Sequence, residues 1–199
     1  ALDAHVAEHE ERRQRRRLGR QHQHPLPGLQ QDAGNAVVHA LRLALTGAQR
    51  HHHGRRPGIQ KGLQRRCQRG LRMYDRVARI LVQAGQRGLG LAAAAPPRPP
   101  EAHWQPYAPL ARVLLQARGL VHHGGIGTAA EGLAAGLPQF VLPFAFDQFD
   151  NASRLVRLGV AHKRPAEWAG ERMLRRALPA WLGDAGLAAR ARTVAAAPG

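Results

Sequence analysis

Residues 122–128 form a glycine-rich turn, His-His-Gly-Gly-Ile-Gly-Thr, between a short apolar run and a helix-like stretch. The run at 119–122 has the composition of a buried strand, and 127–135 has that of a helix. Glycines let the main chain approach a ligand closely, and a helix N-terminus offers unpaired amides and a positive dipole end to an anion. The turn therefore predicts a phosphate-binding loop inside an α/β unit.

The chain beyond residue 82 alternates short apolar runs with amphipathic stretches. We expect strands at the end of 83–91 and at 119–122, 139–142 and 160–162, and helices at 110–117, 127–135, 150–158, 173–182 and 185–196. The four prolines within 92–100 indicate a loop. This alternation predicts a Rossmann-like α/β fold with a parallel sheet, in which ligands bind at the carboxyl ends of the strands.

Two side chains of the glycine-rich turn can add to its main-chain donors. His123 can donate to a phosphate oxygen from the strand end, and Thr128 can cap the helix or donate to a phosphate. The pattern G-x-G-x-x-A from residue 125 also permits a dinucleotide-binding turn. Against that interpretation, the acidic residues near the expected distance, Asp147 and Asp150, lie in a Pro-Phe-rich loop rather than at a strand end. A turn without a ligand, whose histidines are satisfied locally, is the simplest alternative.

Three sequence blocks, taken in order, resemble the donor domain of family 1 (UDP-glycosyltransferase) GT-B glycosyltransferases. They are Trp104-Gln105-Pro106-Tyr107, the turn at 122–128 with Glu131 in the following helix, and Pro143-Phe144-Ala145-Phe146-Asp147-Gln148-Phe149-Asp150-Asn151. The resemblance covers about residues 85–185. It is nearest to bacterial members that act on sterols, antibiotic aglycones and rhamnolipid precursors, and to erythromycin CIII-like C-terminal domains. It implies the C-terminal (donor) half of a GT-B fold.

The resemblance implies how the nucleoside and the sugar are bound. Trp104 would stack on the base, and Tyr107 stands where many members have a glutamine that contacts the base or ribose. Glu131 would accept hydrogen bonds from the ribose hydroxyls, whereas Asp147 and Gln148 would contact the sugar hydroxyls. Core packing is the alternative for the tryptophan, and a solvated helix face is the alternative for the glutamate.

The resemblance likewise assigns the diphosphate to the glycine-rich turn. His123 would contact the diphosphate, and Gly125, Gly127 and Thr128 would supply amide and hydroxyl donors. Plant members carry an asparagine at the position of Gly127, so one side-chain donor is absent here. Asn151 either orients the loop of the third block or is a plain helix N-cap.

The implied reaction is inverting transfer of a hexose from a UDP- or dTDP-sugar to a hydroxyl of a small hydrophobic acceptor (a lipid, sterol or natural product). The resemblance implies no metal and no cofactor. Family members carry the catalytic base, a histidine backed by an aspartate, in a separate N-terminal acceptor domain, and residues 1–82 do not show that pattern. We therefore expect a hexosyltransferase donor domain that transfers sugar slowly or not at all without an acceptor domain. The main alternative is a non-catalytic nucleotide-sugar-binding protein with a basic arm. A GT-B epimerase or a peptidoglycan-type transferase would share the fold, but the Asp-Gln pair argues against both.

Residues 1–82 differ from the rest of the chain in composition. They carry 17 Lys and Arg against 6 Asp and Glu, they contain no Phe, Trp or Ser, and Tyr74 is their one Phe, Tyr or Trp residue. So few large apolar groups predict a poorly structured segment, in which only 36–45 and 77–82 could face a core. The segment is a nucleic-acid-binding arm, a disordered tail or the product of an out-of-frame reading of a GC-rich gene. We favour the last and expect no nucleic-acid partner, because aromatic stacking platforms are absent.

We accordingly divide the chain into the basic segment 1–82 and a nucleotide-sugar-binding domain at 83–199. The absence of a long apolar stretch predicts no transmembrane segment, and the start of the chain does not resemble a signal peptide. The single cysteine, Cys67, argues against cysteine-based zinc sites and, with the missing signal peptide, favours the cytoplasm. Loss of the acceptor half would expose an apolar surface, so we also expect self-association or peripheral membrane contact.

Overall fold

The computed structural model describes residues 36–40, 57–91, 102–105 and 108–197, all within the unit that extends from Gly34 to Gly199. Its strands are β1 (Ala36–Ala40), β2 (Arg87–Leu91), β3 (Ala102–Gln105), β4 (Ala117–His122), β5 (Gln139–Val141) and β6 (Ala161–Lys163). Its helices are α3 (Pro57–Gln83), α4 (Leu110–Leu114), α5 (Ile126–Ala134), α6 (Gln148–Arg157), α7 (Glu171–Leu182) and α8 (Ala185–Ala196), with a 3₁₀ turn at Ala166–Trp168.

The described strands form one sheet in the order β3-β2-β1-β4-β5-β6, and every neighbouring pair is parallel. The order reverses between β1 and β4, which makes that junction the topological switch point of a doubly wound sheet. The predicted Rossmann-like α/β fold is confirmed. The strands and helices expected after residue 82 are found with shifts of a few residues at their ends, whereas β1 and β3 were not predicted.

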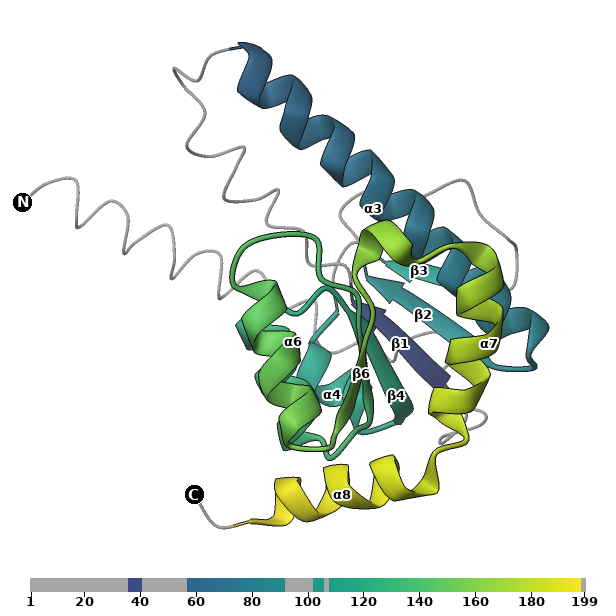
Figure 1. Ribbon diagram of the computed structural model, residues 1–199. Coiled ribbons are helices and arrows are strands. Elements are labelled where there is room, and N and C mark those ends of the chain that lie inside the picture. The colour runs from purple at the N-terminus through teal and green to yellow at the C-terminus, as the bar shows by residue number, and fades with distance from the viewer. Residues whose placement is uncertain (1–35, 41–56, 92–101, 106–107, 198–199) are drawn as a thin grey trace, which may run out of the picture. The chain divides into compact units, whose positions relative to one another are not determined.

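Helices cover both faces of the sheet (Figure 1). On one face, α3 contacts α7 and β2, and the core there contains Tyr74, Leu81, Phe140 and Trp181. On the other face, α5, α6 and α8 cover β5 and β6 through small and branched side chains, which are Ala129, Val141, Ala152, Leu155, Val160, Ala161 and Ala191. The strands are buried on both sides, as parallel strands require.

The segment expected to be poorly structured contains two ordered elements. Val37 and Val38 of β1 are fully buried at the centre of the sheet, and the boundary expected after residue 82 falls inside α3, one residue before its end. Residues 1–35 and 41–56 lie outside the described residues. The two stretches expected to be able to face a core, 36–45 and 77–82, do so where the structure describes them. The expectation was wrong for the earlier part of α3, because it counted apolar residues rather than their spacing.

The spacing of a few large side chains is what orders α3. Tyr74, Val77 and Leu81 recur at intervals of three and four residues, so they lie on one stripe of the helix, and all three are fully buried. The opposite face carries arginines such as Arg72 and Arg79. A helix needs one such stripe to pack, even in a basic segment.

Trp181 is the largest fully buried side chain in the described residues. It lies edge-on to Phe140 with 5.6 Å between ring centroids. On β4 its ring occupies the space beside Gly119, where an added Cβ would come within 2.7 Å of the indole. One aromatic side chain of α7 thereby joins β4 and β5.

We expect Trp181→Ala to lower the free energy of unfolding by about 3–5 kcal/mol, because it opens a cavity in the core. Trp168→Ala is the matched control, since Trp168 is 70% exposed and its loss should change stability by less than about 0.5 kcal/mol. Urea titration of both variants measures the difference. Equal effects would contradict the packing described for α7.

Candidate functional site

Two loops meet beyond the C-terminal ends of β4 and β5. The β4–α5 loop holds residues 123–125, and the β5–α6 loop holds residues 142–147. The register aligns His122, Val141 and Lys163 as the last row of β4, β5 and β6, so both loops emerge at the same edge of the sheet. Because β4 adjoins the switch point, this is where ligands bind in open parallel sheets.

A chain of buried hydrogen bonds holds the β4–α5 loop. The amide of Gly124 donates to Nδ1 of His122 at 3.2 Å, so the proton of the imidazole is on Nε2. Nε2 lies 2.8 Å from Oε1 of Gln139 and donates to it, and the Gln139 amide donates to the carbonyl of Ala129 in α5 at 3.3 Å. The loop, β5 and the helix are thus tied through two side chains.

His122 is held as a neutral donor and acceptor. Burial and, to a smaller extent, the neighbouring His123 lower the pKa of His122, the hydrogen bond to Gln139 opposes both, and the net result is a pKa of about 3 instead of 6.5. A protonated ring could not accept the proton of the Gly124 amide. The loop therefore keeps its hydrogen bond between Gly124 and His122 only while His122 is neutral.

Two glycines of the loop leave room that any side chain would fill. Gly124 has a φ of +93°, and an added Cβ would lie 2.9 Å from the main-chain oxygen of Gln148. At Gly125 an added Cβ would lie 2.8 Å from Nε2 of His123. Gly124 therefore lets the two loops approach each other, and Gly125 leaves space for the imidazole of His123.

The N-terminus of α5 begins at this loop. Gly125 is its N-cap residue, and the first bond of the helix runs from the amide of Ala129 to the Gly125 carbonyl at 3.0 Å. The amides of Ile126, Gly127 and Thr128 consequently have no acceptor within the helix. Ile126 and Gly127 are exposed, and Thr128 is buried in the first turn. Because the N-cap is Gly125, Thr128 does not serve as the cap.

The β5–α6 loop is folded around Gln148. Its Oε1 accepts hydrogen bonds from the amides of Phe144 at 2.9 Å and Ala145 at 3.2 Å. Phe146, between these residues and the helix, is 85% exposed and has a φ of +56°. Such a left-handed, non-glycine residue stores strain that the surrounding bonds must hold.

Asn151 joins the two loops. Its Nδ2 donates to the Gly124 carbonyl at 2.9 Å and to Oδ2 of Asp147 at 3.0 Å. The N-cap of α6 is Asp147, so the N-cap interpretation of Asn151 was wrong and the loop-orienting one is confirmed. Through this amide, the predicted diphosphate loop and the predicted sugar-binding pair lie side by side.

The other predicted residues occupy different positions. Glu131 is half-buried on α5, one turn after Thr128. Trp104 is half-buried on β3, which β2 and β1 separate from β4, and its ring lies over Gly90 and against the core on the α3 side. Tyr107 lies outside the described residues. The base-stacking role of Trp104 stays a prediction.

Sequence reasoning missed the supporting residues His122 and Gln139. The first was noted only as part of the turn, and the second was assigned to an apolar strand. A glutamine inside such a strand was the available signal, since a buried amide needs partners. Gly132 was a second signal, because an added Cβ there would lie 2.9 Å from Nε2 of Gln139.

Within the part of the chain that the structure describes, no group of three His, Cys, Asp or Glu side chains could hold a metal ion. No helix in that part is long and apolar enough to cross a membrane.

The pH dependence of stability tests the state of His122. The pKa of His122 in the folded chain, about 3, is below the ordinary 6.5. The contribution of neutral His122 to the free energy of unfolding is therefore fully present above pH 6.5. As the pH falls below 6.5, the unfolded chain takes up a proton that the folded chain excludes, and stability declines by at most about 1.4 kcal/mol per pH unit. Asn at this position can still accept from the Gly124 amide but does not titrate.

We therefore expect the stability advantage of the native chain over His122→Asn to shrink between pH 6.5 and 4, as measured by urea unfolding. Because the two chains share all other titrating groups, the effects of those groups cancel in the difference between the two free energies of unfolding. A difference that does not change with pH would contradict a neutral, buried His122.

Several glycosyltransferases of known sequence match part of the chain. Oleandomycin glycosyltransferase of Streptomyces antibioticus is 40% identical over 90 residues, which are 45% of this chain and 21% of that protein. Sterol 3-beta-glucosyltransferase of Aspergillus clavatus is 44% identical over 64 residues, 32% of this chain and 5% of that one. The chain thus spans about a fifth or less of the length of these relatives.

Solved structures share the fold over most of the chain. Spinosyn rhamnosyltransferase SpnG complexed with thymidine diphosphate matches with a TM-score of 0.64 and 22% identity, covering 86% of this chain and 44% of that one. Glycosyltransferase VinC in complex with dTDP matches with a TM-score of 0.62 and 20% identity, covering 86% and 39%. At these identities the likeness establishes the fold.

The family model of the erythromycin biosynthesis protein CIII-like C-terminal domain matches residues 80–198. This match covers more than half of the chain and includes β2–β6, α4–α8 and both site loops. The chain therefore belongs to the erythromycin CIII-like C-terminal domain family of glycosyltransferases.

Proposed function

We propose that this chain is the donor-binding half of a hexosyltransferase and binds the diphosphate of a UDP- or dTDP-sugar at the β4–α5 loop. The observation that carries the proposal is the junction made by Asn151, which places the N-terminus of α5 next to Asp147 and Gln148. Two proteins with this fold, SpnG and VinC, were solved with thymidine diphosphate.

In this proposal the diphosphate lies over the first turn of α5. The amides of Ile126, Gly127 and Thr128 donate to its oxygens, and the positive end of the helix dipole stabilises its charge. His123 donates from the strand end. These groups stabilise the diphosphate as it leaves the anomeric carbon, because their positions are fixed before the reaction.

The remaining donor contacts follow from position. Glu131, one turn further along α5, accepts hydrogen bonds from the ribose hydroxyls. Asp147 and the amide nitrogen of Gln148 contact the sugar hydroxyls, while Oε1 of Gln148 keeps its bonds to the loop. Trp104 and Tyr107 are the candidates for contact with the base.

The acceptor hydroxyl needs a general base, and none of the described residues at these loops is assigned that role. The base is proposed to come from an acceptor domain, which also binds the small hydrophobic acceptor. The chain alone then binds nucleotide without appreciable transfer. The alternative is a non-catalytic nucleotide-sugar-binding protein, which would stay inactive even when an acceptor domain is supplied.

Calorimetric titration of the 199-residue chain with dTDP and UDP tests the proposal. We expect Gly125→Ala to weaken nucleotide binding by about tenfold or more, equivalent to about 1.4 kcal/mol, because the added methyl group displaces the His123 ring. Gly170→Ala is the matched control: nothing lies within 4 Å of its added Cβ, and Gly170 precedes α7 and is not part of the proposed donor site.

For the control we expect nucleotide affinity within about threefold of the native value and a stability change of no more than about 1 kcal/mol, because Gly170 is the N-cap residue of α7. No measurable binding of either nucleotide by the native chain would overturn the proposal. Equal losses in the two variants would show that the position of His123 does not matter. Sugar transfer by the chain alone would contradict the need for an acceptor domain.

A further inference from the structure

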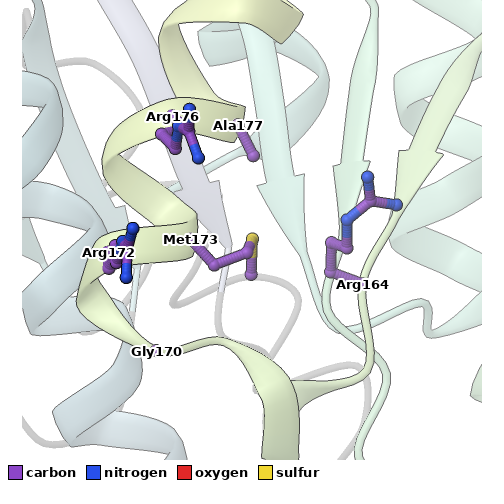
Figure 2. Close-up of a pocket in the computed structure, with 6 residues that line it drawn as sticks. All are labelled: Arg164, Gly170, Arg172, Met173, Arg176 and Ala177. Carbon is purple, nitrogen blue, oxygen red and sulfur yellow. The ribbon is translucent and has the colours of Figure 1, made fainter.

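A second concave site lies between the residue that follows β6 and the first two turns of α7. The pocket has a volume of about 570 Å³ and is lined by Arg164, Gly170, Arg172, Met173, Arg176 and Ala177. None of the residues assigned to the donor site lines it. Figure 2 shows Arg172 and Arg176 on one side of the space and Arg164 on the other, with Met173 and Ala177 between them.

The charged side chains around this pocket are all arginines, and carbon atoms rather than nitrogens make up most of its accessible lining. Arg172 and Arg176 are four residues apart on α7, so they are neighbours on the helix surface, and like charges at that spacing disfavour the helix. Arg164 uses one amino group to donate to the Lys163 carbonyl at 2.8 Å, which leaves its other donors available. No aspartate or glutamate is among the described residues that line the pocket.

Two carboxylates on α7 and α3 are bound to other arginines. Glu171 bonds Arg175 at 2.7 Å, and Asp75 of α3 pairs with Arg79 at 3.2 Å. The lining of the pocket offers Arg172 and Arg176 no carboxylate of its own. A cluster of cations without an internal counter-charge favours an external anion, and arginine suits the planar, bidentate recognition of phosphate.

The floor of the pocket is apolar. Met173 and Ala177 are half-buried and pack against the main core, and the sulfur of Met173 lies within the space between the arginines (Figure 2). Methionine adapts its shape to irregular apolar ligands. The volume is within the range of sites that hold small molecules, and it exceeds what a bare phosphate ion needs.

We infer that this pocket binds a small soluble phosphate monoester with a short apolar body, separately from the nucleotide at the donor site. The phosphate group bridges the pair Arg172 and Arg176 to Arg164, and the apolar part covers Met173 and Ala177. A phosphate monoester in a lipid headgroup has the same chemistry, and the concave shape favours the soluble form.

Calorimetric titration of the full chain with hexyl phosphate tests this inference. We expect hexyl phosphate to bind more tightly than inorganic phosphate, and hexanol not to bind. The double variant Arg172→Gln and Arg176→Gln should lose affinity by about tenfold or more. Arg192→Gln is the matched control, since Arg192 is exposed on α8, and it should bind as the native chain does. Glutamine keeps helix propensity in every variant, and thermal unfolding checks that each one is folded.

Excess dTDP should leave the affinity for hexyl phosphate unchanged, because the two sites share no described residue. Competition by dTDP, or an equal loss in the double variant and the Arg192→Gln control, would overturn the inference. Binding to phosphatidylcholine vesicles that contain phosphatidic acid, without binding of hexyl phosphate, would overturn the soluble ligand in favour of a lipid headgroup. Since the donor site plays no part in this titration, failure here leaves the proposed nucleotide binding intact.

Discussion

The geometry of the proposed donor site depends on how the imidazole of His122 is held. Its ring accepts from Gly124 and donates to Gln139, whose amide reaches the carbonyl of Ala129. Each atom has one role, so the chain of bonds fixes the tautomer, the path of the loop and the start of α5 together. A buried polar network of this kind rigidifies its surroundings when every member is satisfied.

The second constraint on these loops is the space that three glycines leave for neighbouring groups. Gly132 leaves room for the amide of Gln139, Gly124 lets the β5–α6 loop approach, and Gly125 leaves room for His123. Asn151 then fastens the approaching loops, because its amide donates to one residue on each side. Together these features hold the two loops at one edge of the sheet. The β5–α6 loop also contains the exposed, strained Phe146.

The sequence predicted the sheet and most of its helices, and it marked the candidate loop at residues 122–128, because those features are local. An apolar run of three or four residues between turn signals indicates a buried strand, and a glycine-rich turn before a helix indicates an anion-binding loop. The stretch 36–45 was expected to be able to face a core, but strand β1 within it was not predicted, because its pairing partners β2 and β4 are far away in the sequence. For the same reason, the partners of His122 and Asn151 could not be deduced from spacing.

The role of Trp104 illustrates the limit of motif matching. The motif gives its place in the chain, but the direction of the ring is set by Gly90 on the neighbouring strand. Likewise, the pocket beside α7 combines Arg164 with arginines from a helix that begins several residues later, so no local pattern marks it. Charge clusters that come from separate elements become visible only in the folded chain.

The most direct test of the account is to follow main-chain amide resonances of the chain by NMR during titration with dTDP. The account predicts that the largest shifts occur at residues 123–128 and 147–151, with small changes at Arg172 and Arg176. The bound amides of Ile126, Gly127 and Thr128 should also become protected from hydrogen exchange. Shifts centred elsewhere, or saturable binding that leaves the first turn of α5 unperturbed, would contradict a donor site at this loop.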